Sequence, residues 1–316
     1  MTKRRKVVIS IISILCILLI GLCVVWGVCE SMNNQVVTFV VADTLSDGSG
    51  KKAKVIILAG QSNASGCSQD EYLKQNVSAE KYAEYESGYN NVYINYLAGL
   101  NTSDGFVKCS TRQGEIEGCF GPELGLAEEL NKMYPDEMFF IIKCAWGGSN
   151  LNKQWRSPSA FGATGNLYKQ FRSFVKANME YLTSKNYDVE IEGMCWMQGE
   201  SDSCTSKMAN KYKGYLTKLI NDVRKEFAKY ESLDGIAFVD AYIANNPEFW
   251  THYDLINMSK KEVSEQSDIN TVIDTVGHGL SCMEEPSGSP DLAHYDSLSE
   301  IKLGNLFAEE ISKFFD

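Results

Sequence analysis

The chain alternates between short, continuous apolar runs and longer segments whose apolar residues recur every three or four positions. A continuous run rich in β-branched residues is typical of a strand buried on both faces, and the wider spacing is typical of a helix with one buried face. Strands that alternate with helices predict a parallel sheet covered on both sides. The runs fall at 55–58, 92–97, 138–144, 191–197 and 235–240, and the helical patterns at 122–133, 167–182, 208–230 and 303–314.

This pattern predicts one three-layer α/β/α domain with a mainly parallel sheet over residues 53–316, without an internal repeat. The first thirty residues differ, because a basic cluster at 3–6 precedes the uncharged stretch 7–28, which is long enough to cross a bilayer. We expect residues 1–30 to form a cytoplasmic basic tip and a transmembrane signal anchor, with a removed signal peptide as the alternative. Residues 31–52 are expected to be a stalk. The positive-inside rule then places the domain outside the cell membrane, or makes it secreted if the N-terminal segment is cleaved.

Charge and cysteine content narrow the classes of partner. All 41 acidic residues but only 26 of the 30 basic ones follow position 29, so the outer part of the chain carries a net charge of −15. Such a surface repels nucleic acid, and a neutral substrate is the easier partner. Of ten cysteines, seven follow position 29, and no Cys-x-x-Cys pair indicates a zinc or redox site. Disulfides are compatible with an outward location, and Cys109 with Cys119 or Cys195 with Cys204 are candidate pairs.

Unusual polar or glycine-rich turns follow three of the predicted strands. They are the segments 60–63 (Gly-Gln-Ser-Asn), 146–149 (Trp-Gly-Gly-Ser) and 196–202 (Trp-Met-Gln-Gly-Glu-Ser-Asp). In a parallel sheet the carboxyl ends of the strands meet at one edge, where ligands bind. A fourth segment, 291–294 (Asp-Leu-Ala-His), places a histidine three residues after a carboxylate, just before the last helix.

Together these segments contain the groups that acyl transfer requires. Ser62 is the candidate nucleophile and His294 the base, with Asp291 orienting the imidazole ring; Asp296 is a competing carboxylate nearby. The oxyanion hole would consist of the backbone N–H groups of Ser62 and of Gly147 or Gly148, with the side-chain amide of Gln198. Each segment taken alone also fits a purely structural role as a tight turn or a helix cap. The presence of all four segments in one chain favours the catalytic interpretation.

Five segments resemble the ordered sequence blocks of the SGNH-hydrolase superfamily. Besides the four above, the fifth is 121–125 (Gly-Pro-Glu-Leu-Gly). Within the superfamily they most resemble the sialate O-acetylesterase and acetylxylan esterase branch, carbohydrate esterase family 6. The resemblance implies the flavodoxin-like SGNH fold and assigns the serine, glycine, amide and Asp-x-x-His roles to the residues named above. Gln61, Asn63 and Glu200 are implied to bind substrate or support the site.

The sequence therefore predicts a serine ester hydrolase that removes acetyl groups from sialic acid or hemicellulose-type sugars. It would use an acetyl-serine intermediate, without a metal or an organic cofactor. One alternative is a lipase or thioesterase of the same fold, although the loops at 89–120 and 158–166 are rich in Gly, Ser, Asn and Tyr, as a sugar site would be. The other is a non-catalytic glycan-binding protein. The sequence leaves the glycan and the oligomeric state open.

Overall fold

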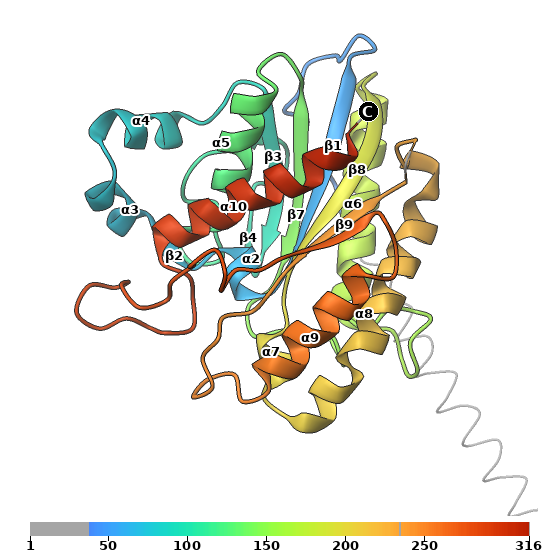
Figure 1. The fold of residues 1–316 in the computed structure, drawn as a ribbon. Coiled ribbons are helices and arrows are strands. Elements are labelled where there is room, and N and C mark those ends of the chain that lie inside the picture. The colour runs from blue at the N-terminus through green and yellow to red at the C-terminus, as the bar shows by residue number, and fades with distance from the viewer. Residues whose placement is uncertain (1–37, 234, 316) are drawn as a thin grey trace, which may run out of the picture. The chain divides into compact units, whose positions relative to one another are not determined.

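The computed structural model describes residues 38–233 and 235–315, which belong to one compact unit (Figure 1). The predicted transmembrane stretch 7–28 lies outside the described residues. Within the part of the chain that is described, no helix is both long and apolar enough to span a bilayer.

The centre of the unit is a mainly parallel sheet, as the alternation of apolar runs predicts. Strand β1 (Lys52–Gly60) lies in the middle, between β7 (Phe139–Ala145) and β8 (Asp188–Met197), and is buried from Ala53 onward. The strand order is β10-β9-β8-β1-β7-β3-β4, and only the short β4 and β5 run antiparallel to their neighbour β3. The remaining strands are β3 (Val92–Ala98), β4 (Asn101–Thr102), β5 (Val107–Lys108), β9 (Ala237–Ala241) and β10 (Asn270–Ile273), and a separate ribbon pairs β2 (Ser68–Gln69) with β6 (Cys119–Phe120).

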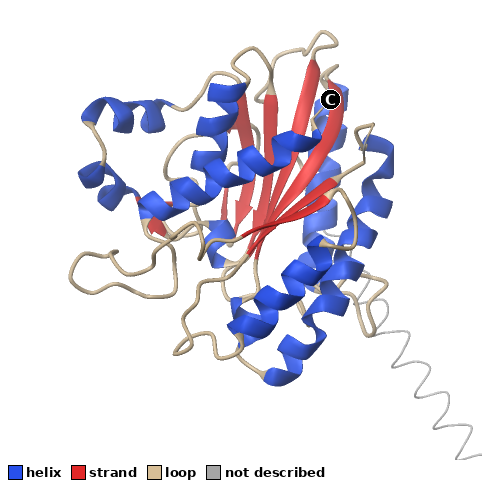
Figure 2. Ribbon diagram, in the orientation of Figure 1, coloured by secondary structure: helices blue, strands red, loops and turns tan. Residues whose placement is uncertain are grey.

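Helices cover both faces of this sheet (Figures 1 and 2). Helices α5 (Glu123–Met133) and α10 (Ser297–Ile311) lie on one face, and α6 (Asn166–Ser184) and α8 (Ser206–Phe227) lie on the other. Helix α9 (Tyr253–Ser264) packs on α8 and β10. Shorter pieces are α2 (Ser62–Ser65), α3 (Asp70–Asn76), α4 (Ala79–Ser87), α7 (Glu200–Ser203) and the 3₁₀ turns Ala228–Tyr230 and Ser312–Phe314. The predicted three-layer α/β/α architecture is therefore confirmed for the described residues.

Two glycines allow helices α5 and α10 to cross with their backbones in contact. A Cβ atom on Gly125 would lie 2.0 Å from the carbonyl oxygen of Ile301, and one on Gly304 would lie 2.1 Å from that of Pro122. Only glycine permits so close an approach of two backbones. The crossing holds the first half of α10 against α5, and α10 begins shortly after the predicted Asp-x-x-His turn.

The predicted stalk at 31–52 needs a correction in its second half. Residues 38–51 form no strand, but Phe39, Val41 and Leu45 pack against the main core. The backbone N–H groups of Thr44 and Leu45 each donate to the hydroxyl of Tyr181, at 3.0 Å. Apolar burial and these hydrogen bonds make this segment part of the domain, so a free linker would have to lie before Thr38.

A buried ion pair joins α5 to strand β7 of the sheet. Lys143 of β7 and Glu123 of α5 are both fully buried, and their Nζ and Oε2 atoms are 2.7 Å apart. Lys143 also donates to the carbonyl oxygen of Gln113 at 3.0 Å, and Glu123 accepts from the N–H of Gly121 at 2.9 Å. The pair thus fixes the loop that runs between residues 113 and 121.

Lys143→Met should lower the free energy of unfolding by about 3–5 kcal/mol, because it leaves the Glu123 carboxylate buried without its cation. Chemical denaturation at neutral pH measures the change. The matched control is Lys132→Met. Lys132 pairs with Glu129 on the same helix, but the side chain of Lys132 is 71% exposed. That change should cost less than about 1 kcal/mol. Equal costs for the two variants would mean that the buried pair does not hold this region together.

Candidate active site

The three predicted turns meet at one edge of the sheet. In the sheet register Gly60, the last residue of β1, pairs with Ala145 on one side and Met197 on the other, so the three strands end level. Gly60 has φ +148°, and a Cβ atom there would lie 1.9 Å from the carbonyl oxygen of Met197. Glycine is required at this bend. The chain then turns into α2, whose first residue is the half-buried Ser62.

Gln61 ties the nucleophile turn to the turn that follows β8. Its side chain is buried, and its Oε1 atom accepts from the amide of Gln198 and from the backbone N–H of Ser201, each at 3.2 Å. Its own N–H donates to the carbonyl oxygen of Met197 at 2.9 Å. Gln61 is therefore a supporting residue of the site, one of the two roles that the sequence resemblance allowed.

Gln198 differs from its predicted role. The side chain is fully buried, and its Nε2 atom lies 2.8 Å from a carboxylate oxygen of Asp202 and 3.2 Å from the carbonyl oxygen of Ser149. With Gln61 as the third acceptor, both amide hydrogens are engaged inside the protein. Asp202 also accepts from the backbone N–H groups of Leu151 and Asn152, at 2.7 and 3.0 Å. Gln198 and Asp202 thus hold the turn after β7 in place, and the amide is not presented to an oxyanion.

The turn after β7 offers one of its two glycines to a ligand. The N–H of Gly147 donates to Oε2 of Glu115 at 2.8 Å, so the prediction that it lines the oxyanion hole is wrong for this conformation. Gly148 is exposed with φ +64°, and nothing lies within 4 Å of the position that a Cβ would take. In the described part of the chain, no acceptor is bonded to the N–H of Gly148 or to that of Ser62. These two N–H groups remain available as oxyanion donors.

Asp291 is the carboxylate that contacts the histidine. Its Oδ2 atom lies 2.6 Å from Nδ1 of His294, and its Oδ1 atom accepts from the backbone N–H groups of Ala293 and His294 at 2.8 and 2.9 Å. The competing carboxylate, Asp296, is buried and accepts from the backbone N–H groups of residues 283–285 instead. The geometry therefore selects Asp291 as the partner of the ring.

Burial and hydrogen bonding act in opposite directions on this pair. For His294, desolvation favours the neutral ring, but interactions with Asp291 and with the side chain of Cys67 outweigh it and raise the pKa to about 10. For Asp291, desolvation favours the protonated acid, but the bonds from the ring and backbone of His294 outweigh it and lower the pKa. The imidazolium–carboxylate form of the pair is thus favoured, and the neutral base becomes populated as the pH rises.

Asn63 connects the nucleophile turn to the histidine. Its Oδ1 atom accepts from the N–H of Tyr295 at 3.1 Å, and its Nδ2 atom lies 3.5 Å from the carbonyl oxygen of Ala293. These are the two residues that flank His294, so the side chain next to Ser62 sets the position of the base. Nδ2 also donates to Oε1 of Glu200 at 2.8 Å, and burial raises the pKa of that carboxyl group. Asn63 and Glu200 are positioning residues.

Sequence reasoning missed two residues of the site. Glu115 accepts from Ser65 of α2 at 2.5 Å as well as from Gly147, and so links the first two turns. Cys67 helps to raise the pKa of the His294 ring. The place of Cys67 in the sequence, five residues after Ser62, could have drawn attention to it. Glu115 lies in a long loop and has no such local signal.

All seven described cysteines are free thiols, so neither candidate disulfide forms. Among residues 38–233 and 235–315, no group of three or more His, Cys, Asp or Glu side chains is placed to hold a metal ion.

The chain matches one family model over most of its length. Residues 52–313, which include every residue of the site, match the family described as carbohydrate esterase, sialic acid-specific acetylesterase. The chain belongs to this carbohydrate esterase family. The resemblance seen in the sequence blocks is thereby confirmed, and the family consists of enzymes that act on acetyl esters. No curated protein matches the chain.

Solved structures share the fold of this carbohydrate esterase. A protein from Arabidopsis thaliana is 18% identical over 83% of this chain and 99% of its own, with a TM-score of 0.59. NanS is 15% identical over 86% and 99%, with a TM-score of 0.57. A carbohydrate acetylesterase from Xanthomonas citri is 14% identical over 83% of this chain and 56% of its own, with a TM-score of 0.53. At these identities the likeness concerns the fold.

In this esterase, Asn63→Ala should lower kcat for an acetyl ester by about 10²-fold, since a misplacement of the base by about 1 Å costs that much. KM should change little, because the side chain bonds the protein's own backbone and carboxylate. Steady-state kinetics with a chromogenic acetyl ester measure both constants. Asn76→Ala is the matched control, since Asn76 is exposed at the end of helix α3 and donates to the carbonyl oxygen of Tyr72 on the same helix. A change confined to KM would instead make Asn63 a substrate-binding residue.

Proposed function

We propose that the protein is a serine esterase that hydrolyses O-acetyl esters on carbohydrates through an acetyl-Ser62 intermediate. The observation that carries the proposal is the bridge formed by Asn63, the residue after Ser62, to Ala293 and Tyr295 on either side of His294, whose ring is bonded to Asp291. Membership of the carbohydrate esterase family supports the same class of substrate.

In this mechanism the Ser62 hydroxyl attacks the ester carbonyl carbon while the neutral ring of His294 accepts its proton. Asp291 holds the ring by Nδ1 and stabilises the imidazolium that forms. The N–H groups of Ser62 and Gly148 are free to donate to the oxyanion of the tetrahedral intermediate. As the bond between the carbonyl carbon and the sugar oxygen breaks, the imidazolium gives its proton to that oxygen, and the sugar leaves with a free hydroxyl. A water molecule, deprotonated by His294, then attacks the acetyl carbonyl carbon. The bond to Ser62 Oγ breaks, acetate leaves, and His294 returns the proton to Oγ.

The test is acetate release by the purified full-length chain, with acetylated sialic acid and acetylated xylan compared at equal concentration of acetyl groups. Mass spectrometry of the quenched reaction should find an acetyl group on the peptide that contains Ser62. The serine mechanism would be contradicted if wild-type protein released acetate without forming this adduct and Ser62→Ala released acetate as well. A preference for acyl chains longer than acetyl would favour the lipase or thioesterase alternative, and saturable glycan binding without turnover would favour the non-catalytic one.

We also propose that residues 1–30 anchor the enzyme in the cell membrane with its domain outside. The basic cluster at 3–6, the uncharged stretch 7–28 and the acidic remainder support this orientation. Because residues from Thr38 onward belong to the compact unit, protease added to intact cells should cut before Thr38 and release an active domain. Protection in intact cells, with cleavage only after lysis, would reverse the orientation.

A further inference from the structure

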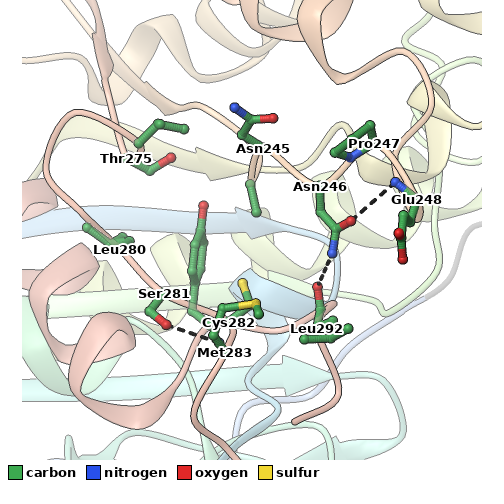
Figure 3. Close-up of a pocket in the computed structure, with 13 residues that line it drawn as sticks. Asn245, Asn246, Pro247, Glu248, Thr275, Leu280, Ser281, Cys282, Met283 and Leu292 are labelled. Atoms are coloured by element: carbon green, nitrogen blue, oxygen red, sulfur yellow. Dashed lines mark hydrogen bonds between the residues drawn. The ribbon is translucent and has the colours of Figure 1, made fainter.

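A cavity of about 630 Å³ lies next to the turn that carries the catalytic histidine (Figure 3). It is formed by the segment 244–248 after β9 and the segment 275–283 after β10, and Leu292 and Tyr295, on either side of His294, complete its wall. Its volume is within the range of about 300–1,000 Å³ that is usual for ligand sites. Ser62, Gly148 and His294 do not line it, so it is a neighbour of the active site rather than the site itself.

The wall of the cavity combines hydrogen-bonding and apolar groups. The side chains of Asn245, Asn246 and Ser281 can both donate and accept, and Val276 and Leu280 add apolar surface. No lysine, arginine or histidine is among the described lining residues, whereas Glu248 contributes a carboxylate. This composition disfavours an anionic ligand, which would meet a negative charge without a compensating cation. It fits an uncharged molecule with many hydroxyl groups and apolar C–H faces.

The cavity is also connected to the catalytic turn through one side chain. Nδ2 of Asn246 donates to the carbonyl oxygen of Leu292 at 3.2 Å, and its Oδ1 atom accepts from the N–H of Glu248 at 3.2 Å (Figure 3). Leu292 has φ +63°, a left-handed conformation that costs a branched residue free energy and persists only when neighbours hold it. A ligand in the cavity therefore contacts the residues that keep the Asp291–His294 turn in its conformation.

We propose that this cavity is a subsite for a neutral sugar unit of the substrate glycan, next to the acetylated unit that reacts at Ser62. The proposal rests on the carbohydrate substrate of the proposed function and adds that the neighbouring unit is uncharged. The enzyme would then prefer acetylated neutral oligosaccharides to esters that lack this unit, and would not place a sialic acid in this position.

Calorimetric titration of the full-length chain with xylotetraose tests the subsite without requiring turnover. Val276→Trp fills the cavity from a side chain that is 47% exposed, and should weaken xylotetraose binding by about tenfold. The control is Leu233→Trp, which adds the same ring at a site that is 89% exposed and precedes the start of β9, whereas the cavity follows the end of that strand. It should leave the affinity unchanged. A sialylated tetrasaccharide should bind wild type at least about tenfold more weakly than xylotetraose.

The outcomes separate this inference from the proposed function. Equal xylotetraose affinities for Val276→Trp and Leu233→Trp would overturn the subsite, as would tighter binding of the sialylated probe or no detectable binding of xylotetraose to wild type. Acetyl release depends on Ser62 and is measured separately. A protein that binds xylotetraose in the cavity but releases no acetate would keep the subsite and lose the proposed reaction.

Discussion

Ser62→Ala and His294→Ala should each lower kcat for acetyl ester hydrolysis by on the order of 10⁵- to 10⁶-fold, with little change in the fold. Without the Ser62 hydroxyl no acetyl-enzyme can form, and without the His294 ring nothing removes the hydroxyl proton. Because the two residues act in one step, the double variant should be little slower than either single variant. Burst and steady-state kinetics with a chromogenic acetyl ester give the rates.

Ser78→Ala is the control for loss of a serine hydroxyl away from the site. Ser78 caps helix α4 by accepting from the N–H of Lys81, so its loss should cost about 1 kcal/mol of stability and leave kcat unchanged. Strictly additive losses in the Ser62–His294 double variant would show that the two residues do not act together. Residual activity in Ser62→Ala close to that of wild type would leave the nucleophile role to another group, with Cys67 beside His294 the first to examine.

The central strands could be predicted because they are buried on both faces. The run at 55–58 lies within β1, and the run at 191–197 is the buried end of β8, whose first residues are exposed or half-buried. Strand β10 was not predicted, because at the edge of the sheet only Ile273 of its four residues is fully buried and no continuous apolar run results. The sequence pattern therefore reveals the centre of a sheet better than its margins.

The site was predictable in its members and less so in its contacts. The three turns meet because parallel strands end together, and Asp291 contacts His294 because three residues of a turn bring them side by side. The role of Gln198 could not be read in the same way, because an amide at a strand end can face a ligand or the protein. Here Asp202, four residues later, engages it at 2.8 Å. The N–H of Gly147 donates to Glu115, which lies in a loop 32 residues away in sequence, so no local pattern predicts this contact.

The dependence of the rate on pH follows from the same contacts. Desolvation alone would lower the pKa of His294, but interactions with Asp291 and with the side chain of Cys67 outweigh it and raise the pKa to about 10. Because the reaction needs the neutral ring, kcat/KM should rise with pH, with a midpoint above the ordinary value of about 6.5. A flat profile from pH 5 to 10, with the chemical step limiting, would contradict a histidine base.

Asp291→Asn should lower kcat by about 10²- to 10⁴-fold and move that midpoint to lower pH. The amide oxygen can still accept from the backbone N–H groups of Ala293 and His294, so the turn should persist. What disappears is the negative charge 2.6 Å from Nδ1, which favours the protonated ring and stabilises the imidazolium formed during the reaction. Removing it therefore lowers the pKa of His294 while slowing the chemical step.

The matched variant is Asp296→Asn. It leaves the ring alone but weakens acceptance from the backbone N–H groups of residues 283–285, so it should reduce the free energy of unfolding without moving the midpoint of the pH profile. A structural role for Asp291 would affect stability but not the profile. If Asp296→Asn moved the midpoint and Asp291→Asn did not, then Asp296 would be the carboxylate that orients the base, and the turn would have to rearrange when substrate binds.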